Sequence, residues 1–204
     1  MTTVDPYISG WNKASDWRAC RAKLVPATGN TDWEQAFEDF FSVRLRLRYL
    51  DPIKVLQDNG SFQGEGFSIV AIQCTLVEFL ESTVQGINYQ YANPGPFEYS
   101  GSRRLFVQFL TERPPFRNEF SEALAKDFYE GVRCGLLHEA RTKNGWTIWG
   151  ETPGATVIDA QRKIVYRNNF QTALLDFVAR YKKDLLSEVR LQEAFIRKFD
   201  AICA

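Results

Sequence analysis

The sequence is poor in the residues from which most metal and catalytic sites are built. It has a single histidine, His138, and four isolated cysteines, with no Cys-x2-Cys pair and no Cys/His cluster. Such a composition argues against a zinc site and leaves reduced thiols as the default. The GxxxxGK[ST], GxGxxG, HExxH and GxSxG patterns are also missing. We therefore expect no metal and no cofactor.

Excess charge and long apolar runs are lacking as well. The 25 basic residues balance 25 acidic ones, so no global positive field attracts nucleic acid, and any RNA contact must come from a local patch. The longest apolar run, around 69–80, is too short to span a bilayer, and the first residues do not form a secretory signal. We expect a soluble, cytoplasmic protein that does not enter a membrane.

Helical periodicity dominates what is present. Thr31 and Glu34 have capping-box spacing, and apolar stripes predict several helices. The helices are expected after 31, over 66–85 and 103–110, over about 118–141, and from 168 onward in one long final helix. Short β-type runs at 146–149, 156–158 and 163–166 predict a small antiparallel sheet. The fold class is thus mainly α, a helical bundle with a β insertion before the last long helix.

We expect one main domain. Residues 1–30 should form an irregular arm that Trp11 and Trp17 anchor on the body. Residues 31–204 should form a single helical domain with the β insertion at about 146–166. No internal repeat or domain linker is visible.

Two arginine-rich stretches are candidates for phosphate contacts, with solvated helix faces as the ordinary alternative. In the first, Arg44 and Arg48 share a helix face and Arg46 points elsewhere. The second is the densest basic stretch of the chain and consists of Arg103, Arg104, Arg113 and Arg117.

The stretch with the clearest chemistry is 127–142, DFYEGVRCGLLHEART, which carries Arg133 and His138 five residues apart. Histidine side chains can take up or release a proton near neutral pH. Arginine presents a permanently charged, planar fork of donors that suits phosphate. A group that transfers a proton and a cation that binds an oxyanion are the minimum that cleavage of a phosphodiester requires.

The Arg-x4-His pattern within FYEGVRCGLLHEA resembles the HEPN superfamily, and the resemblance covers roughly 67–186. It implies a HEPN-like helical bundle and a metal-independent endoribonuclease, of the kind found in toxin–antitoxin and phage-defence systems. It also implies catalytic roles for Arg133 and His138, RNA as substrate, a homodimer and a cognate antitoxin. Cys134 departs from the polar residue that active members often carry after the arginine.

Three further residues are candidates for supporting roles. Glu78 can orient His138 or pair with Arg133, and its alternative is a stripe that faces water. Tyr129, one turn before Arg133, can stack on a base or bind a phosphate, and its alternative is core packing. Cys134 lies directly beside the arginine.

Geometry favours a dimer. Side chains five residues apart on a regular helix diverge by about 140°, so Arg133 and His138 need a distorted turn, a long reach or a second chain to converge. Gly131 and Gly135, four apart, leave one helix face open to another helix, either internal or from a partner chain. We expect them at a dimer contact.

Two functions from different classes follow. The first is the endoribonuclease, which leaves 2′,3′-cyclic phosphate products. The second is a catalytically inert HEPN-like module that binds a nucleotide, RNA or a partner protein. The third possibility is that His138 has only a structural role.

Overall fold

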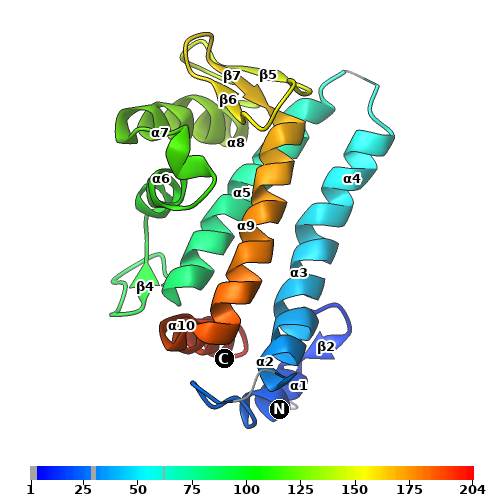
Figure 1. The fold of residues 1–204 in the computed structure, drawn as a ribbon, viewed down its shortest axis with the longest axis vertical. Helices are drawn as coiled ribbons and strands as arrows, with labels where there is room; N and C mark the ends of the chain where they lie inside the picture. The colour runs from blue at the N-terminus through cyan, green and yellow to red at the C-terminus, as the bar shows by residue number, and fades with distance from the viewer. Residues whose placement is uncertain (1–3, 29–30, 62) are drawn as a thin grey trace. The chain divides into compact units, whose positions relative to one another are not determined.

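The structure is a computed structural model that describes residues 4–28, 31–61 and 63–204. It confirms the mainly α class, with 63% of the chain helical and only small sheets (Figure 1). The described chain divides into two compact units rather than an arm and one body. Unit 1 comprises Met1–Pro52, Ser82–Ser100 and Arg180–Ala204, and unit 2 comprises Ile53–Glu81 and Gly101–Ala179.

Unit 1 contains a continuous helical run that alternates between α-helical and π-helical turns. The run consists of α2 (Thr31–Ala36), a π-helical turn (Phe37–Ser42), α3 (Val43–Leu45), a second π-helical turn (Arg46–Leu50) and the start of α4 (Asp51–Asp58). Its core is aromatic: Trp17 packs against Phe40, Phe195 and Phe199 at centroid distances of 5.1–6.1 Å. The Trp17 indole N–H donates to Asp200 Oδ1 over 2.8 Å.

The N-terminal part of unit 1 is more regular than the irregular arm expected from the sequence. Strands β1 (Tyr7–Ser9) and β2 (Asn12–Lys13) form an antiparallel hairpin, followed by α1 (Ala14–Arg21). Trp17 is buried as expected, but Trp11 is 87% exposed at the hairpin turn. The expectation that Trp11 anchors this segment on the body is therefore wrong.

Unit 2 contains most of α5 (Glu65–Gln85), together with α6 (Ser102–Glu112), α7 (Glu122–Phe128) and α8 (Gly135–Glu139). A π-helical turn, Tyr129–Cys134, joins α7 to α8 without interruption. The buried rings of Phe109, Phe116, Phe128 and Phe170 form the core of this unit. Figure 1 shows the green helices α6–α8 beside α5.

The predicted β insertion is present, but its topology is mixed. Strands β5 (Thr147–Trp149), β6 (Ile158–Asp159) and β7 (Ile164–Tyr166) form one sheet in the order β5-β7-β6. The β6–β7 pair is antiparallel as expected, whereas β5 pairs with β7 in parallel. The fully antiparallel prediction is wrong because alternation identifies a strand but carries no information on its direction.

Two helix ends also differ from expectation. The final helix does not continue to Phe199: α9 (Arg167–Ser187) ends at an extended Glu188, and α10 (Val189–Ile202) follows. The helix bearing His138 ends at Glu139, because Ala140 adopts a left-handed conformation with φ of 52°. A further small pair, β3 (Asn88–Tyr89) and β4 (Glu98–Tyr99), was not expected.

Helix α5 is the one described element long and apolar enough to cross a membrane, with a mean hydropathy of 1.4 over its most apolar window. However, 61% of that window is buried inside the protein, as in the core helix of a soluble protein. Its polar side chains have tertiary contacts. Gln73 Nε2, for example, donates to the Arg167 carbonyl and to Gln171 Oε1 in unit 2.

Candidate functional site

Arg133 lies in the π-helical turn and is half-buried against two of the predicted supporting residues. Its Nη2 lies 3.5 Å from Glu78 Oε2 on α5, and the two side chains are 20% and 19% exposed. Its guanidinium carbon lies 5.3 Å from the centroid of the Tyr129 ring, one turn earlier on the same segment. π-helical turns occur frequently at functional sites. The structure thus pairs Glu78 with Arg133, one of the two roles considered for it.

The neighbours of Arg133 keep its charge in place. Burial is the largest single influence on the pKa of Arg133 and lowers it, but Tyr129, Glu78 and a hydrogen bond with Cys134 together raise that pKa above its ordinary value. The guanidinium is therefore a permanent cation, available to an anion on its exposed side. Cys134, the third predicted supporting residue, is adjacent to the arginine in the same turn and contributes to the rise in the pKa of Arg133.

Tyr129 connects the cluster to α6. Its hydroxyl and Ser102 Oγ lie 2.9 Å apart and share a hydrogen bond at the start of that helix. Its ring packs edge-on against Phe106 at 5.4 Å. Burial raises the pKa of the Tyr129 hydroxyl, so the group is a neutral phenol at physiological pH. Tyr129 therefore combines the core packing considered for it with a half-exposed face next to Arg133.

His138 lies apart from this cluster. It is exposed near the end of α8, two residues before the left-handed Ala140. Within the described residues, no hydrogen bond or ion pair connects His138 to Arg133, Glu78 or any other side chain. The structure of a single chain therefore brings Glu78, Tyr129 and Cys134 to Arg133 but does not bring His138.

Gly131 and Gly135 are covered by the chain itself. A Cβ atom on Gly131 would lie 2.6 Å from Trp146 Cδ1, and one on Gly135 would lie 2.5 Å from the Arg141 carbonyl oxygen. The loop 140–146 therefore packs directly against these two glycines. The interpretation of these two glycines as a dimer contact is therefore corrected to an internal packing contact of unit 2.

Asp127 holds that loop on the helix. Its carboxylate accepts hydrogen bonds from the Trp146 indole, at 2.9 Å, and from Lys163 Nζ, at 2.8 Å. Glu139, directly after His138, pairs with Lys143 over 2.6 Å and also with Arg141. Asp127 and Glu139 thus serve the loop and are not engaged with His138.

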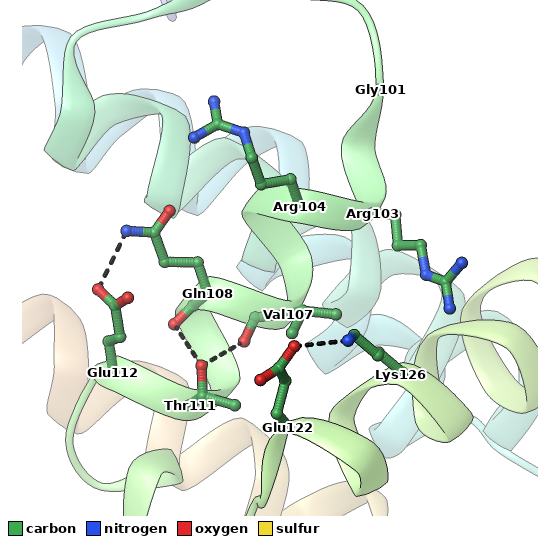
Figure 2. Close-up of a pocket in the computed structure, with 9 residues that line it drawn as sticks. All are labelled: Gly101, Arg103, Arg104, Val107, Gln108, Thr111, Glu112, Glu122 and Lys126. Atoms are coloured by element: carbon green, nitrogen blue, oxygen red, sulfur yellow. Dashed lines mark hydrogen bonds and ion pairs between the residues drawn. The ribbon is translucent and has the colours of Figure 1, made fainter.

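A groove of about 750 Å³ lies between α6 and α7 (Figure 2). Its cations are Arg103, Arg104 and Lys126, of which Lys126 pairs with Glu122 and Arg103 with Glu130. Arg104 is exposed and makes no ion pair with a described residue. Sequence reasoning identified the two arginines but missed Lys126, whose only local signal is its four-residue spacing from Glu122.

The rest of the second basic stretch is dispersed. Arg113 forms a two-bond ion pair with Glu81, both bonds being 2.8 Å, and Glu81 is completely buried. This pair belongs to the interior of unit 2 and not to a phosphate surface. Arg117 is exposed within the short 3-10 turn (Phe116–Asn118) that follows α6.

The described residues contain no group of three or more His, Cys, Asp or Glu side chains that could hold a metal ion. The groups that these residues offer for chemistry are a positioned guanidinium, a phenol and an exposed imidazole. Comparison of the chain with protein families, with curated proteins and with solved structures gives no match.

Proposed function

We propose that the chain is a metal-independent endoribonuclease of the HEPN type, with Arg133 and His138 as its catalytic residues. The observation that supports this most directly is that Glu78 and Tyr129 restrain the guanidinium group of Arg133. The exposed His138 lies on the same short helical segment. A cation restrained before substrate arrives stabilises charge in a transition state without reorganising.

In the proposed reaction, His138 removes the proton from a ribose 2′-OH. The 2′-oxygen then forms a bond to the adjacent phosphorus, and the bond from phosphorus to the 5′-oxygen breaks. The leaving 5′-oxygen takes up a proton, which gives a 2′,3′-cyclic phosphate and a 5′-OH. Arg133 stabilises the charge on the phosphoryl oxygens. DNA has no 2′-OH and does not react by this route.

The separation of the two residues in one chain makes a homodimer part of the proposal. An Arg133 from one chain and a His138 from another can approach one phosphate where the two from the same chain diverge. A cognate antitoxin as partner and a cytoplasmic location belong to the same proposal.

A second function, the inert binding module, is favoured by one observation. Arg133 already has a carboxylate partner in Glu78, and no described residue orients His138. Such a site can bind a nucleotide, RNA or a partner protein without transferring a proton.

Substitutions of the two residues distinguish these functions. For a nuclease, His138→Ala should lower RNA cleavage by about 10²–10⁴-fold, since general acid–base catalysis typically contributes that factor. Arg133→Ala and Arg133→Lys should both lose activity, because an ammonium cannot reproduce the planar fork. Wild-type cleavage should persist in EDTA. Cleavage is measured on labelled RNA, with cyclic phosphate ends identified by mass spectrometry.

The matched control is Arg162→Ala, which removes an exposed arginine of the same unit outside the Arg133 cluster and outside the second basic stretch. It should keep the cleavage rate within about twofold. An inert module gives no cleavage by the wild type, and Arg133→Ala then weakens a complex while His138→Ala has little effect. A His138→Ala variant with full activity contradicts the proposed mechanism.

A further inference from the structure

The turn of the β1–β2 hairpin displays two aromatic rings to solvent. Trp11 is 87% exposed and Tyr7 54% exposed, and their rings meet edge to face with centroids 5.8 Å apart. Val4 and Leu47 add apolar surface, at 87% and 42% exposure. A tryptophan with this exposure contributes little to a core, since its indole remains in water.

The hairpin beneath these rings is held firmly. Gly10 has a φ of 57°, and a Cβ there would lie 2.9 Å from Val43 Cγ1, so the turn is pressed on α3. Ser9 Oγ and Asn12 Nδ2 both donate to the Asp39 carbonyl, over 2.6 and 3.0 Å. The rings are therefore presented on a rigid support, which lowers the entropy lost when they bind a ligand.

Arginines of the first basic stretch complete this support. Arg44 and Arg48, which share a face as predicted, both donate to the Ile8 carbonyl from beneath the hairpin. Burial, with the neighbouring charge of Arg48, lowers the pKa of Arg44 to about 10, so the group still carries its charge at neutral pH. A solvated face is therefore the wrong interpretation for Arg44.

The charged groups around the rings are of both signs. Lys13 Nζ lies 5.1 Å from the Tyr7 ring centroid, and the exposed Arg48 donates to the Ile8 carbonyl of the hairpin. Asp16 accepts from the Lys13 amide over 2.7 Å, and Asp5 interacts with the charge of Lys13. The surface thus places two cations, partly offset by these carboxylates, next to accessible aromatic faces.

We propose that this surface, formed by Tyr7, Trp11, Lys13 and Arg48, binds single-stranded RNA. Single strands are held by aromatic faces on which bases stack and by cations that follow the phosphates. A duplex keeps its bases stacked on one another and offers no face to Trp11. The choice of RNA over DNA rests on the proposed nuclease function, whereas binding to the rings does not depend on cleavage.

The test measures binding separately from cleavage. Fluorescence anisotropy follows a labelled 12-nucleotide, 2′-O-methylated RNA, which cannot react through its 2′-oxygen. Trp11→Ala should raise the Kd by about 5- to 150-fold, the range for loss of one stacked base. Trp11→Phe should keep most of the affinity, and Trp11→Leu should not, because leucine is apolar but has no aromatic face. Binding should also quench the emission of exposed Trp11.

Matched controls remove similar groups elsewhere. Tyr91→Ala deletes another aromatic side chain, 84% exposed, and Lys54→Gln deletes a cation that forms an exposed pair with Asp58. Both should bind like the wild type, whereas Lys13→Gln should weaken binding and lower its salt dependence. Thermal melting verifies that each variant folds.

Several outcomes overturn the inference. Equal Kd values for wild type and Trp11→Ala would do so, as would equal binding by Trp11→Leu. A loss of dimer in light scattering, or of binding to anionic vesicles, with RNA affinity unchanged would assign the rings to a protein or lipid surface instead. The two proposals fail separately: His138→Ala should bind the methylated RNA normally, and Trp11→Ala should still cleave a dinucleotide if the nuclease proposal is correct.

Discussion

At the residue scale, Gly135 determines how closely the loop after His138 approaches the helix. Replacing a helical glycine with alanine ordinarily stabilises a helix by about 1 kcal/mol. Here the new Cβ would lie 2.5 Å from the Arg141 carbonyl oxygen, and a backbone atom cannot rotate away. We therefore predict that Gly135→Ala destabilises the protein by about 1–3 kcal/mol, the usual cost of overpacking.

Thermal or urea unfolding measures this change. The control is Gly101→Ala, because a Cβ at Gly101 meets no atom within 4 Å. A Gly135→Ala variant as stable as the Gly101→Ala variant would show that the loop moves freely. If the glycines instead served a dimer, the same substitution would alter the oligomeric state and leave monomer stability unchanged.

The contacts of the site that could be predicted from the sequence are those between residues close together in the chain. Tyr129 lies four residues before Arg133, so their contact follows from helical geometry once a helix is inferred. The pairing of Glu78 with Arg133 was one of two alternatives, and only the packing of α5 decides between them. The bond between Ser102 and Tyr129 joins residues 27 positions apart and has no sequence signal.

At the element scale, Asp127 ties the loop 140–146 and strand β7 to the helix. Burial is the largest influence on its pKa and raises it, but hydrogen bonds from Lys163, Trp146 and Asn144 bring the pKa below the ordinary value of 3.8. A carboxyl group with a lowered folded pKa contributes stability above its unfolded pKa and loses that contribution as the pH falls through its folded pKa. The contribution is thus complete above about pH 4.

We predict that Asp127→Asn lowers the free energy of unfolding at pH 7 by about 1 kcal/mol, since the Lys163 ion pair is partly exposed. The difference between variant and wild type should shrink as the pH falls below 3.8. Urea unfolding at several pH values measures it, with Asp176→Asn, at an exposed carboxylate, as the control. A difference that does not depend on pH would exclude the ion pair as its cause.

The start or end of a helix can be predicted from the sequence where a neighbouring side chain caps it. Ser121 accepts from the Leu124 amide and begins α7. The π-helical turns at Phe37–Ser42 and Tyr129–Cys134 have no such signal, because the residues in them also suit an ordinary α-helix. The break at the extended Glu188 is similar: charged and apolar residues continue on both sides, and no local signal marks the end of α9.

At the scale of the whole molecule, the proposed nuclease requires Arg133 and His138 to meet at one phosphate, supplied either by one chain or by two. The glycine face that suggested a dimer is filled by the loop 140–146 of the same chain. No hydrogen bond or ion pair joins Arg133 and His138 among the described residues, since one is held against Glu78 and the other is exposed without a hydrogen-bond or ion-pair partner. A site shared between chains is a consequence of the proposed nuclease and can be tested without knowing the interface.

We predict that mixing the two inactive variants restores cleavage. In a two-fold dimer with shared sites, a chain carrying Arg133→Ala and a chain carrying His138→Ala form one site with both wild-type residues and one with neither. Random pairing of equal amounts makes about half of the dimers mixed, so about a quarter of the wild-type activity should return.

The measurement is cleavage after the variants are mixed and allowed to exchange, with each variant alone as the baseline. The matched control is the double variant mixed with wild type: each mixed dimer lacks Arg133 in one site and His138 in the other, so only the wild-type dimers, about a quarter of the total, stay active. Light scattering should show a dimer at the concentrations assayed. Mixed variants that stay inactive although they form mixed dimers would place both residues of the site in one chain, and Arg133 would then have to leave Glu78 to reach a phosphate near His138.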